Sequence, residues 1–227
     1  MGVTDRYRRA DHLPAVLPIF PLQGCILLPR ATLPLNIFEP RFLTMVDRVL
    51  AEDRVIGIVQ PLDANDDEES PEDVATPLRH TGCAGRLTSF TETDDGRVLI
   101  TLTGIARFDI IREQESELPY RQCFVDYGPY ERDFVRGDGQ DEVDWERLLQ
   151  VLKEYLTARD LSADWRSIER SPAEMLVNTL AMISPYGPEE KQMLLEAPDL
   201  KRRSEVLMAL AEMELATPDD GSGSGMQ

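Results

Sequence analysis

The chain has 227 residues, of which 42% are hydrophobic, and its formal net charge at pH 7 is −18. This length allows one large or two small domains, and the hydrophobic content suffices for a buried core. The acidic excess repels phosphate backbones and anionic lipid surfaces, and no apolar run approaches the roughly 20 residues that cross a bilayer, so nucleic-acid and membrane partners are disfavoured.

Residues 16–61 predict the order strand, strand, helix, strand. The first part is apolar but is interrupted by prolines at 18, 21, 29 and 34, which favours short extended strands because proline removes a backbone donor. A helix is predicted to begin at Glu39-Pro40, since apolar residues recur from there to position 50 at three- and four-residue spacing. The β-branched run 55–59 then predicts a buried strand.

The segment 62–77 contains seven acidic residues and almost nothing to bury. It therefore predicts an exposed, mobile acidic loop. Such a loop could recruit a basic partner, but a solvated connector is the preferred interpretation.

Residues 81–130 predict β structure. Polar and apolar residues alternate up to Asp94-Asp95-Gly96, a typical signal for a tight hairpin, and the run 98–102 is expected to pair back across it. Gly104 could permit a bulge in that second strand, and 122–127 predicts a further strand. Several strands with one helix among them indicate a compact, barrel-like sheet.

Residues 131–140 are rich in glycine and charge and predict a linker between a β domain, 1–130, and a helical domain, 141–216. Helices are predicted over 141–159, 172–183, 189–196 and 200–216, with Ser171 as the cap of the second. The last segment, 217–227, predicts a flexible tail. The predicted fold class is α+β.

The strings LPIFPL and LPLNIFEPRF, the helix that follows them and the strand VIGIV resemble the opening of the N-terminal, substrate-binding domain of ATP-dependent Lon proteases. A second unit, from TGCAGRLTSF to LITLTGIARFDIIRE, resembles the strand, turn, strand part of that domain and carries Gly104, Arg107 and Phe108. The resemblance implies a PUA-like β pseudo-barrel followed by a helical bundle. Because the chain ends after these helices, it also implies a stand-alone version of the domain.

The resemblance does not extend to the ATPase or protease portions of Lon proteases. The sequence contains no P-loop of the form G-x-x-x-x-G-K-[ST], and the Ser-Lys pair of the Lon protease portion has no counterpart. We therefore predict neither an enzyme nor a cofactor. The expected role is a protein-binding module for unfolded or tagged polypeptides, with an ATP-dependent protease or chaperone as a possible partner.

Polypeptide binding needs exposed apolar side chains flanked by polar ones. The candidates are the apolar loop residues Ile26, Leu27 and Leu28 and the helical methionines Met175, Met182 and Met193, in an expected groove between the β domain and the helices. The family-motif residues are interpreted as structural: Pro34 at a strand end, Phe38 and Phe42 in the core, Glu39 and Arg41 at the helix start with Arg41 bound to a carboxylate, and Gly104, Arg107 and Phe108 as a bulge with a packed aromatic.

Two other functions stay open. An RNA-binding, PUA-like module would need a cluster of arginines, and Arg30, Arg41, Arg48 and Arg54 are the only concentrated set. A small-molecule hydrolase would need His12 or His80 beside one of the cysteines. The cysteines Cys25, Cys83 and Cys123 lack a C-x-x-C pair, so no metal site is predicted; they indicate small buried thiols and a cytoplasmic protein.

Overall fold

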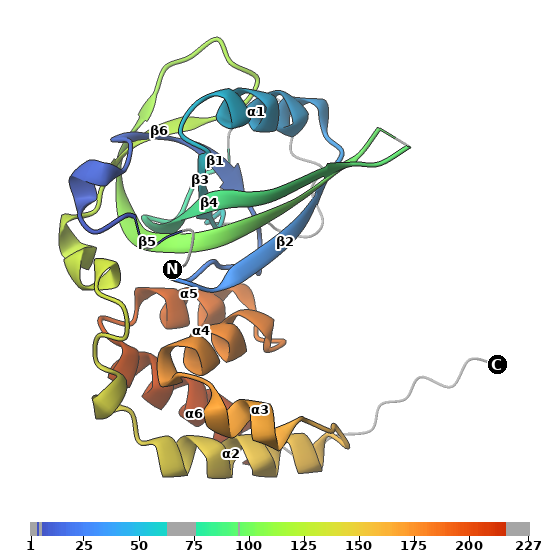
Figure 1. Cartoon of the computed structure of the whole chain (residues 1–227), viewed down its shortest axis with the longest axis vertical. Coiled ribbons are helices and arrows are strands. Elements are labelled where there is room, and N and C mark those ends of the chain that lie inside the picture. The colour runs from blue at the N-terminus through green and yellow to red at the C-terminus, as the bar shows by residue number, and fades with distance from the viewer. Residues whose placement is uncertain (1–3, 5, 63–75, 95, 217–227) are drawn as a thin grey trace.

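The computed structural model describes residues 4, 6–62, 76–94 and 96–216, so most of the predicted loop 62–77 and all of the predicted tail lie outside the described residues. Strands fill the first half of the chain and helices the second (Figure 1). The strands are β1 (Val16–Pro21), β2 (Thr32–Ile37), β3 (Val55–Val59), β4 (Thr81–Glu92), β5 (Val98–Gln114) and β6 (Gln122–Asp126), and helix α1 (Pro40–Ala51) lies between β2 and β3. This arrangement confirms the predicted α+β class.

The six strands form one sheet that closes nearly into a ring. Their order is β2-β5-β4-β3-β1-β6, and β5 pairs in addition with β6. Strands β1 and β3 run parallel, whereas the other pairs are antiparallel. Because β5 is 17 residues long, its first half pairs with β2 and its second half with β6. The ring is thus closed at β6 and open between β1 and β2.

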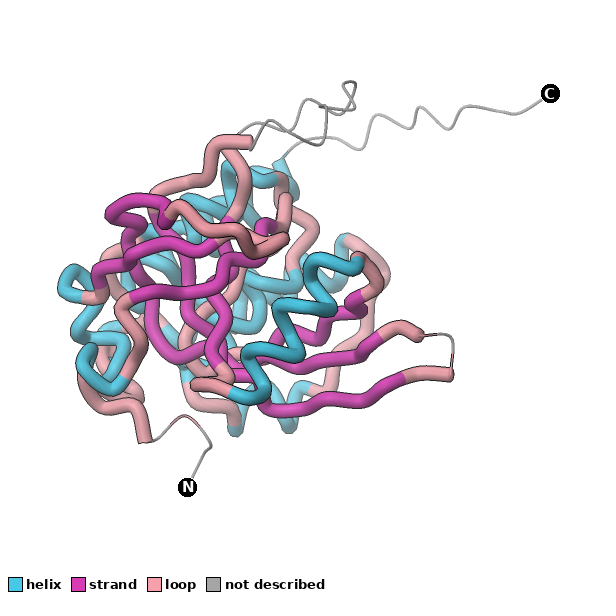
Figure 2. Tube along the Cα trace, turned by 90° about the horizontal axis from the view of Figure 1, so that it is seen from above, coloured by secondary structure: helices cyan, strands magenta, loops and turns pink. Residues whose placement is uncertain are grey.

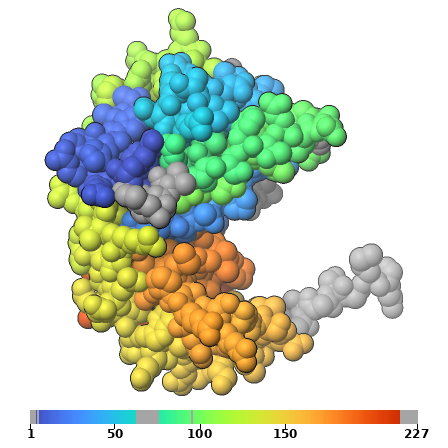
Figure 3. All heavy atoms as spheres, in the orientation of Figure 1, coloured from blue at the N-terminus to red at the C-terminus, as the bar shows by residue number. Residues whose placement is uncertain are grey.

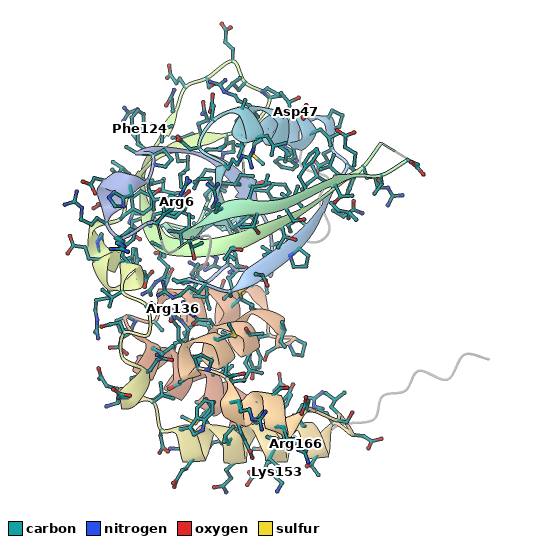
Figure 4. The ribbon with its side chains drawn as sticks, viewed as in Figure 1. Arg6, Asp47, Phe124, Arg136, Lys153 and Arg166 are labelled. Carbon is teal, nitrogen blue, oxygen red and sulfur yellow. The ribbon has the colours of Figure 1, made fainter. Side chains whose placement is uncertain are left out.

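Helix α1 lies over one end of the ring (Figure 1). Its sequence positions Phe42, Met45, Val46 and Val49 are buried, as the apolar spacing predicted, while Asp47 lies on the outer face (Figure 4). The Phe42 ring stacks on Phe20 of β1 with 4.2 Å between the ring centroids. These contacts fix the start of α1 against the strand that borders the opening.

The hairpin of β4 and β5 projects beyond the rest of the described chain (Figure 1, Figure 2). Gly96 in its turn has a φ of 79°, a left-handed conformation that favours glycine. Further along, Gly85 pairs with Gly104 and Ala84 pairs with Ala106, so Ile105 is an extra residue on β5. The predicted hairpin and the predicted bulge at Gly104 are both confirmed.

The second half of the chain contains helices α2 (Trp145–Ala158), α3 (Trp165–Arg170), α4 (Ala173–Ile183), α5 (Pro188–Glu196) and α6 (Leu200–Ala216), and short 3-10 turns occur at Ala10–His12, Gly128–Phe134 and Gln140–Glu142. Helix α2 begins later than predicted because the Asp144 carboxylate accepts the Arg147 N–H and caps it. The predicted Ser171 cap is wrong, since its hydroxyl donates to the Ser167 carbonyl at the end of α3. Helix α3 was not predicted.

One continuous apolar core joins the sheet to the helices. It contains Ile26 and Leu102 from the barrel side together with Leu176, Leu194 and Leu207 from the helices. A second cluster, which includes Leu17, Ile19 and Phe108, fills another part of the barrel. The predicted apolar groove between the two halves is therefore occupied by core side chains where these residues meet.

Candidate functional site

Arg107 of the family motif lies at the centre of a buried polar network. Its guanidinium donates to both carboxylate oxygens of Asp133 at 2.8 Å, and its own backbone N–H donates to the same carboxylate at 2.9 Å. The guanidinium also donates to the carbonyls of Leu195 and Ala197, at the end of α5. Arg107 therefore connects β5 to Asp133 and to the helices.

Two further arginines extend this network toward α4 and α6. Arg30 donates to Glu174 Oε1 at 2.6 Å, and Arg203 donates to Asn178 Oδ1 at 2.9 Å. Burial and the nearby positive charge of Arg107 lower the pKa of Arg203 to about 10, so this side chain stays protonated at neutral pH. Buried charged groups require hydrogen-bonding or oppositely charged partners, and the partners of these arginines come from both halves of the chain.

Gly104 is the point where the loop before β2 approaches β5. A Cβ atom at this position would lie 2.0 Å from the Leu28 carbonyl oxygen. The Arg30 N–H donates to the Gly104 carbonyl at 2.8 Å, and the Gly104 N–H donates to the Ala31 carbonyl at 2.9 Å. Glycine is therefore required here by close backbone contact.

This approach buries the predicted polypeptide-binding loop. The exposed fractions of Ile26, Leu27 and Leu28 are 1%, 0% and 0%. The expected exposure of these residues is wrong, because the loop folds inward beside Gly104 and its side chains complete the core between the sheet and the helices. They offer no surface to a partner in this structure.

The motif LPLNIFEPRF borders a hollow at the opening between β1 and β2. Phe38 is 64% exposed, which corrects its predicted place in the core, whereas Phe42 is 5% exposed. Arg41 forms the expected ion pair, with Glu39 at 2.8 Å. Pro34 lies within β2 and is exposed, so it does not end the strand as predicted.

This hollow, which we call the motif hollow, has a volume of about 270 Å³. It is lined by Phe20, Pro21, Leu22, Leu35, Asn36, Ile37, Phe38, Glu39, Arg41 and Phe42. A second, more polar hollow of about 450 Å³ shares Pro21, Arg41 and Phe42 with it and extends toward Tyr120 and Arg121. The motif residues therefore border solvent-accessible space as well as the core.

A strongly apolar cleft opens in the helical half, between α2, the end of α4 and α6. Its volume is about 280 Å³. It is lined by Leu148, Val151, Leu152, Tyr155, Leu156, Arg159, Leu161, Leu180, Ile183, Ser184, Pro185, Tyr186, Leu207, Met208 and Ala211. We call this the helical cleft. Ile183 and Leu161 at its rim are 69% and 57% exposed, an unusual exposure for large aliphatic side chains.

The polar groups of the helical cleft are paired and few. Tyr155 donates to Glu214 at 2.9 Å, and Arg159 donates to the same carboxylate at 2.8 Å. Burial, followed by the negative charge of Glu214, raises the pKa of Tyr186 to about 12, so this phenol is neutral at physiological pH. The cleft therefore presents apolar atoms with hydrogen-bonding groups at one side, and it carries no activated nucleophile among these residues.

The predicted methionines belong to two helices, Met175 and Met182 to α4 and Met193 to α5. Met175 and Met193 are 50% and 53% exposed, and Met182 is half-buried. None of them lines the helical cleft. The cleft was missed because its walls come from three helices distant in sequence; the exposed Leu161 and Ile183 beside helix ends were the available signal.

The residues considered for other chemistry are engaged elsewhere. Arg41 and Arg48 pair with Glu39 and Glu52 on α1, and Arg30 is held by Glu174 inside the molecule. Three of the four arginines that the RNA alternative requires are therefore already paired with carboxylates. For the hydrolase alternative, His80 approaches Asp109 at 3.6 Å, while Cys83 is fully buried, with its thiol pKa raised by burial.

A family model described as the ATP-dependent protease La (LON) substrate-binding domain matches residues 16–212. The chain belongs to the Lon substrate-binding domain family. The match runs from β1 into α6, so the barrel, the motif hollow and the helical cleft all lie within the Lon domain. The resemblance read from the sequence is thereby confirmed.

Curated relatives of this Lon domain are Lon proteases. The protein from Syntrophus aciditrophicus is 26% identical over 215 residues, which cover 92% of this chain and 26% of the relative. The one from Anaeromyxobacter dehalogenans is 25% identical over 209 residues, covering 88% and 23%. This chain thus spans about a quarter of the length of the curated relatives it matches.

Two solved structures share the fold of this Lon domain. A Lon N-terminal domain protein from Xanthomonas campestris has a TM-score of 0.61 at 24% identity, covering 86% of this chain and 98% of that chain. The N-terminal domain of Mycobacterium avium complex Lon protease has a TM-score of 0.63 at 18% identity, covering 87% and 98%. In the described residues of our Lon domain, no helix is long and apolar enough to cross a membrane.

Proposed function

We propose that this Lon domain is a non-enzymatic module that binds polypeptide clients, and that the helical cleft receives their apolar side chains. The observation that supports this most directly is the cleft itself, an apolar hollow of about 280 Å³ whose rim exposes Ile183 and Leu161. An apolar hollow with a few hydrogen-bonding groups at one side is the usual composition of a recognition pocket. The buried Ile26, Leu27 and Leu28 have no part in this surface.

The client is an unfolded segment with large apolar residues. A folded protein conceals such residues in its core, whereas an unfolded chain presents them. Met175 and Met193, which are about half exposed, are proposed as secondary contacts because methionine adapts to varied partners. An ATP-dependent protease or chaperone would then act on the delivered chain, in the cytoplasm, where three free cysteines stay reduced.

The proposal is tested with a labelled, permanently unfolded and basic polypeptide, reduced and alkylated lysozyme. Fluorescence anisotropy should show saturable binding to the full chain. Ile183→Asp and Leu161→Asp each place a charge at the apolar rim and should weaken binding at least about tenfold, since a charge there must be desolvated by the client. Both positions are exposed, so the fold should tolerate the changes.

The matched control is Ile111→Asp. Ile111 is 64% exposed on β5 and does not line the helical cleft, so this variant adds the same charge without changing the cleft. Its affinity should equal that of the unmodified chain, and circular dichroism should show all three variants folded. Absence of saturable binding, or equal binding by the three variants, would contradict the proposal.

A further inference from the structure

β2 borders the opening of the ring and has an unpaired side. It is the terminal strand of the sheet order and pairs along one side with β5 alone. In Figure 1 it runs along the side of the barrel nearest the helices, and Figure 3 shows the surface hollowed between the projecting hairpin and the helices. An unpaired strand edge presents backbone groups that can bond to another strand.

The register identifies which backbone groups face this edge. The Gly104 N–H donates to the Ala31 carbonyl, and residues 33, 35 and 37 then face β5 in the antiparallel ladder. Thr32, Pro34 and Asn36 therefore direct their backbone groups away from β5. In the described part of the chain, no backbone hydrogen bond outside the ladder involves these three residues. Proline has no N–H to donate, so it is compatible with this middle position only because the backbone groups there face away from β5.

The motif hollow adjoins the end of this edge. Asn36 lines the hollow, which has a volume of about 270 Å³, and Phe38 forms part of its outer wall. Phe20, Leu22 and Phe42 supply apolar walls, and the charged Glu39 and Arg41 also line the hollow. A free strand edge beside an apolar hollow is the combination by which folded domains bind extended peptides: main-chain hydrogen bonds supply affinity, and the hollow selects a side chain.

From this we infer that an extended segment of the client pairs with the free edge of β2 and places one aromatic or large aliphatic side chain in the motif hollow. The inference rests on the proposed function, because the segment belongs to the bound client. The β2 edge would be a second contact site for the client, in addition to the helical cleft. It also assigns an extended conformation to the bound segment, whereas the helical cleft defines no conformation of the client.

A second copy of the chain is a poorer occupant of this edge. Each copy carries a formal charge of −18, so two copies repel each other, whereas a neutral or basic segment is attracted. The unpaired side also offers only the backbone groups of three residues. Edge-to-edge pairing of two copies through so short a strand buries far less than the roughly 1,000 Å² that a stable interface requires, whereas the proposed client also contacts the helical cleft.

The direct test is amide hydrogen exchange by NMR on the full chain, with and without saturating reduced and alkylated lysozyme. The N–H groups of Thr32 and Asn36 should exchange at least about tenfold more slowly when the polypeptide is bound, because they then donate to its backbone. The N–H groups of Leu33 and Leu35 already donate to β5 and should change little. Binding that leaves Thr32 and Asn36 unprotected would overturn the inference.

A pair of variants tests the hollow. Phe38→Ala removes part of its wall and should weaken polypeptide binding at least about tenfold. Ile111→Ala is the control, since Phe38 and Ile111 are each 64% exposed. Equal affinity of the two variants would also overturn the inference. If the Ile183→Asp variant does not bind, and binding to the unmodified chain leaves the exchange rates of the Thr32 and Asn36 N–H groups unchanged, the proposed function stands and the β2 contact is rejected. If the unmodified chain does not bind the polypeptide at all, both are rejected.

Discussion

Arg107 and Asp133 form an ion pair that is almost fully enclosed, with 2% and 8% of their side chains exposed. Changing Asp133→Asn keeps the shape but leaves the Arg107 charge buried without its counter-ion. We expect the free energy of unfolding at pH 7 to fall by about 3–5 kcal/mol, measured by urea denaturation. The control is Glu113→Gln, which breaks the more exposed pair with Arg121 and should cost no more than about 1 kcal/mol.

The same pair predicts a pH dependence. Burial by itself raises the pKa of Asp133, but the hydrogen bonds and charge of Arg107 outweigh it and leave the pKa below its usual range. A depressed folded-state pKa contributes stability that is present above the unfolded-state pKa and is lost as the pH falls through the folded one. The difference in unfolding free energy between the unmodified chain and Asp133→Asn should therefore shrink below about pH 4. A difference that stays constant from pH 7 to pH 3 would contradict this account.

The sequence motif identified Arg107 and Phe108, but not what they contact. Phe108 is fully buried, as an aromatic beside a bulge suggests. Asp133 lies in the segment interpreted as a linker, and nothing in the local pattern of charges marks it as the partner of Arg107. The amphipathic pattern predicted Phe38 in the core together with Phe42. Its position just before α1 instead leaves it exposed at the motif hollow.

Among the elements, the contact between β5 and the loop before β2 depends on Gly104. Gly104→Ala would place a methyl group 2.0 Å from the Leu28 carbonyl oxygen, so backbone must move. We expect a loss of about 3 kcal/mol in the free energy of unfolding, at the upper end of overpacking effects, measured by urea denaturation. Gly24→Ala serves as control: its φ is 64° but no atom lies within 4 Å, so the cost should be about 1 kcal/mol. An equal loss in the free energy of unfolding for the two variants would show that the close contact at Gly104 does not determine the effect of the substitution.

Elements with a strong local pattern were predicted well, and elements defined by packing were not. The alternation and turn around Gly96 indicated the hairpin, and the apolar spacing from Phe42 onward indicated α1. Helix α3 has six residues, too few for a helical period to become visible. The burial of Ile26, Leu27 and Leu28 follows from the contact at Gly104, which is 76 residues from Leu28 in the chain.

For the molecule as a whole, the features that support polypeptide binding arise from distant segments. The helical cleft combines α2, α4 and α6, and the motif hollow combines β1, β2 and α1. The polar network combines Arg30, Arg107, Glu174 and Arg203, which join the loop before β2, β5, α4 and α6. The pattern of a single sequence does not show which of these distant segments come into contact. The family resemblance led us to expect a polypeptide-binding surface, and we propose its place from the packing of these segments.

The formal charge of −18 predicts how the proposed client would approach the whole molecule. A basic unfolded polypeptide is attracted over long range at low salt, whereas contacts in the apolar cleft are barely screened. Between about 0.01 and 0.15 M NaCl, where the Debye length falls from about 30 to 8 Å, the association rate of reduced and alkylated lysozyme should drop at least about tenfold. The dissociation rate should change much less. Stopped-flow fluorescence measures both, with a neutral unfolded polypeptide as control, and a salt effect confined to dissociation would refute charge steering.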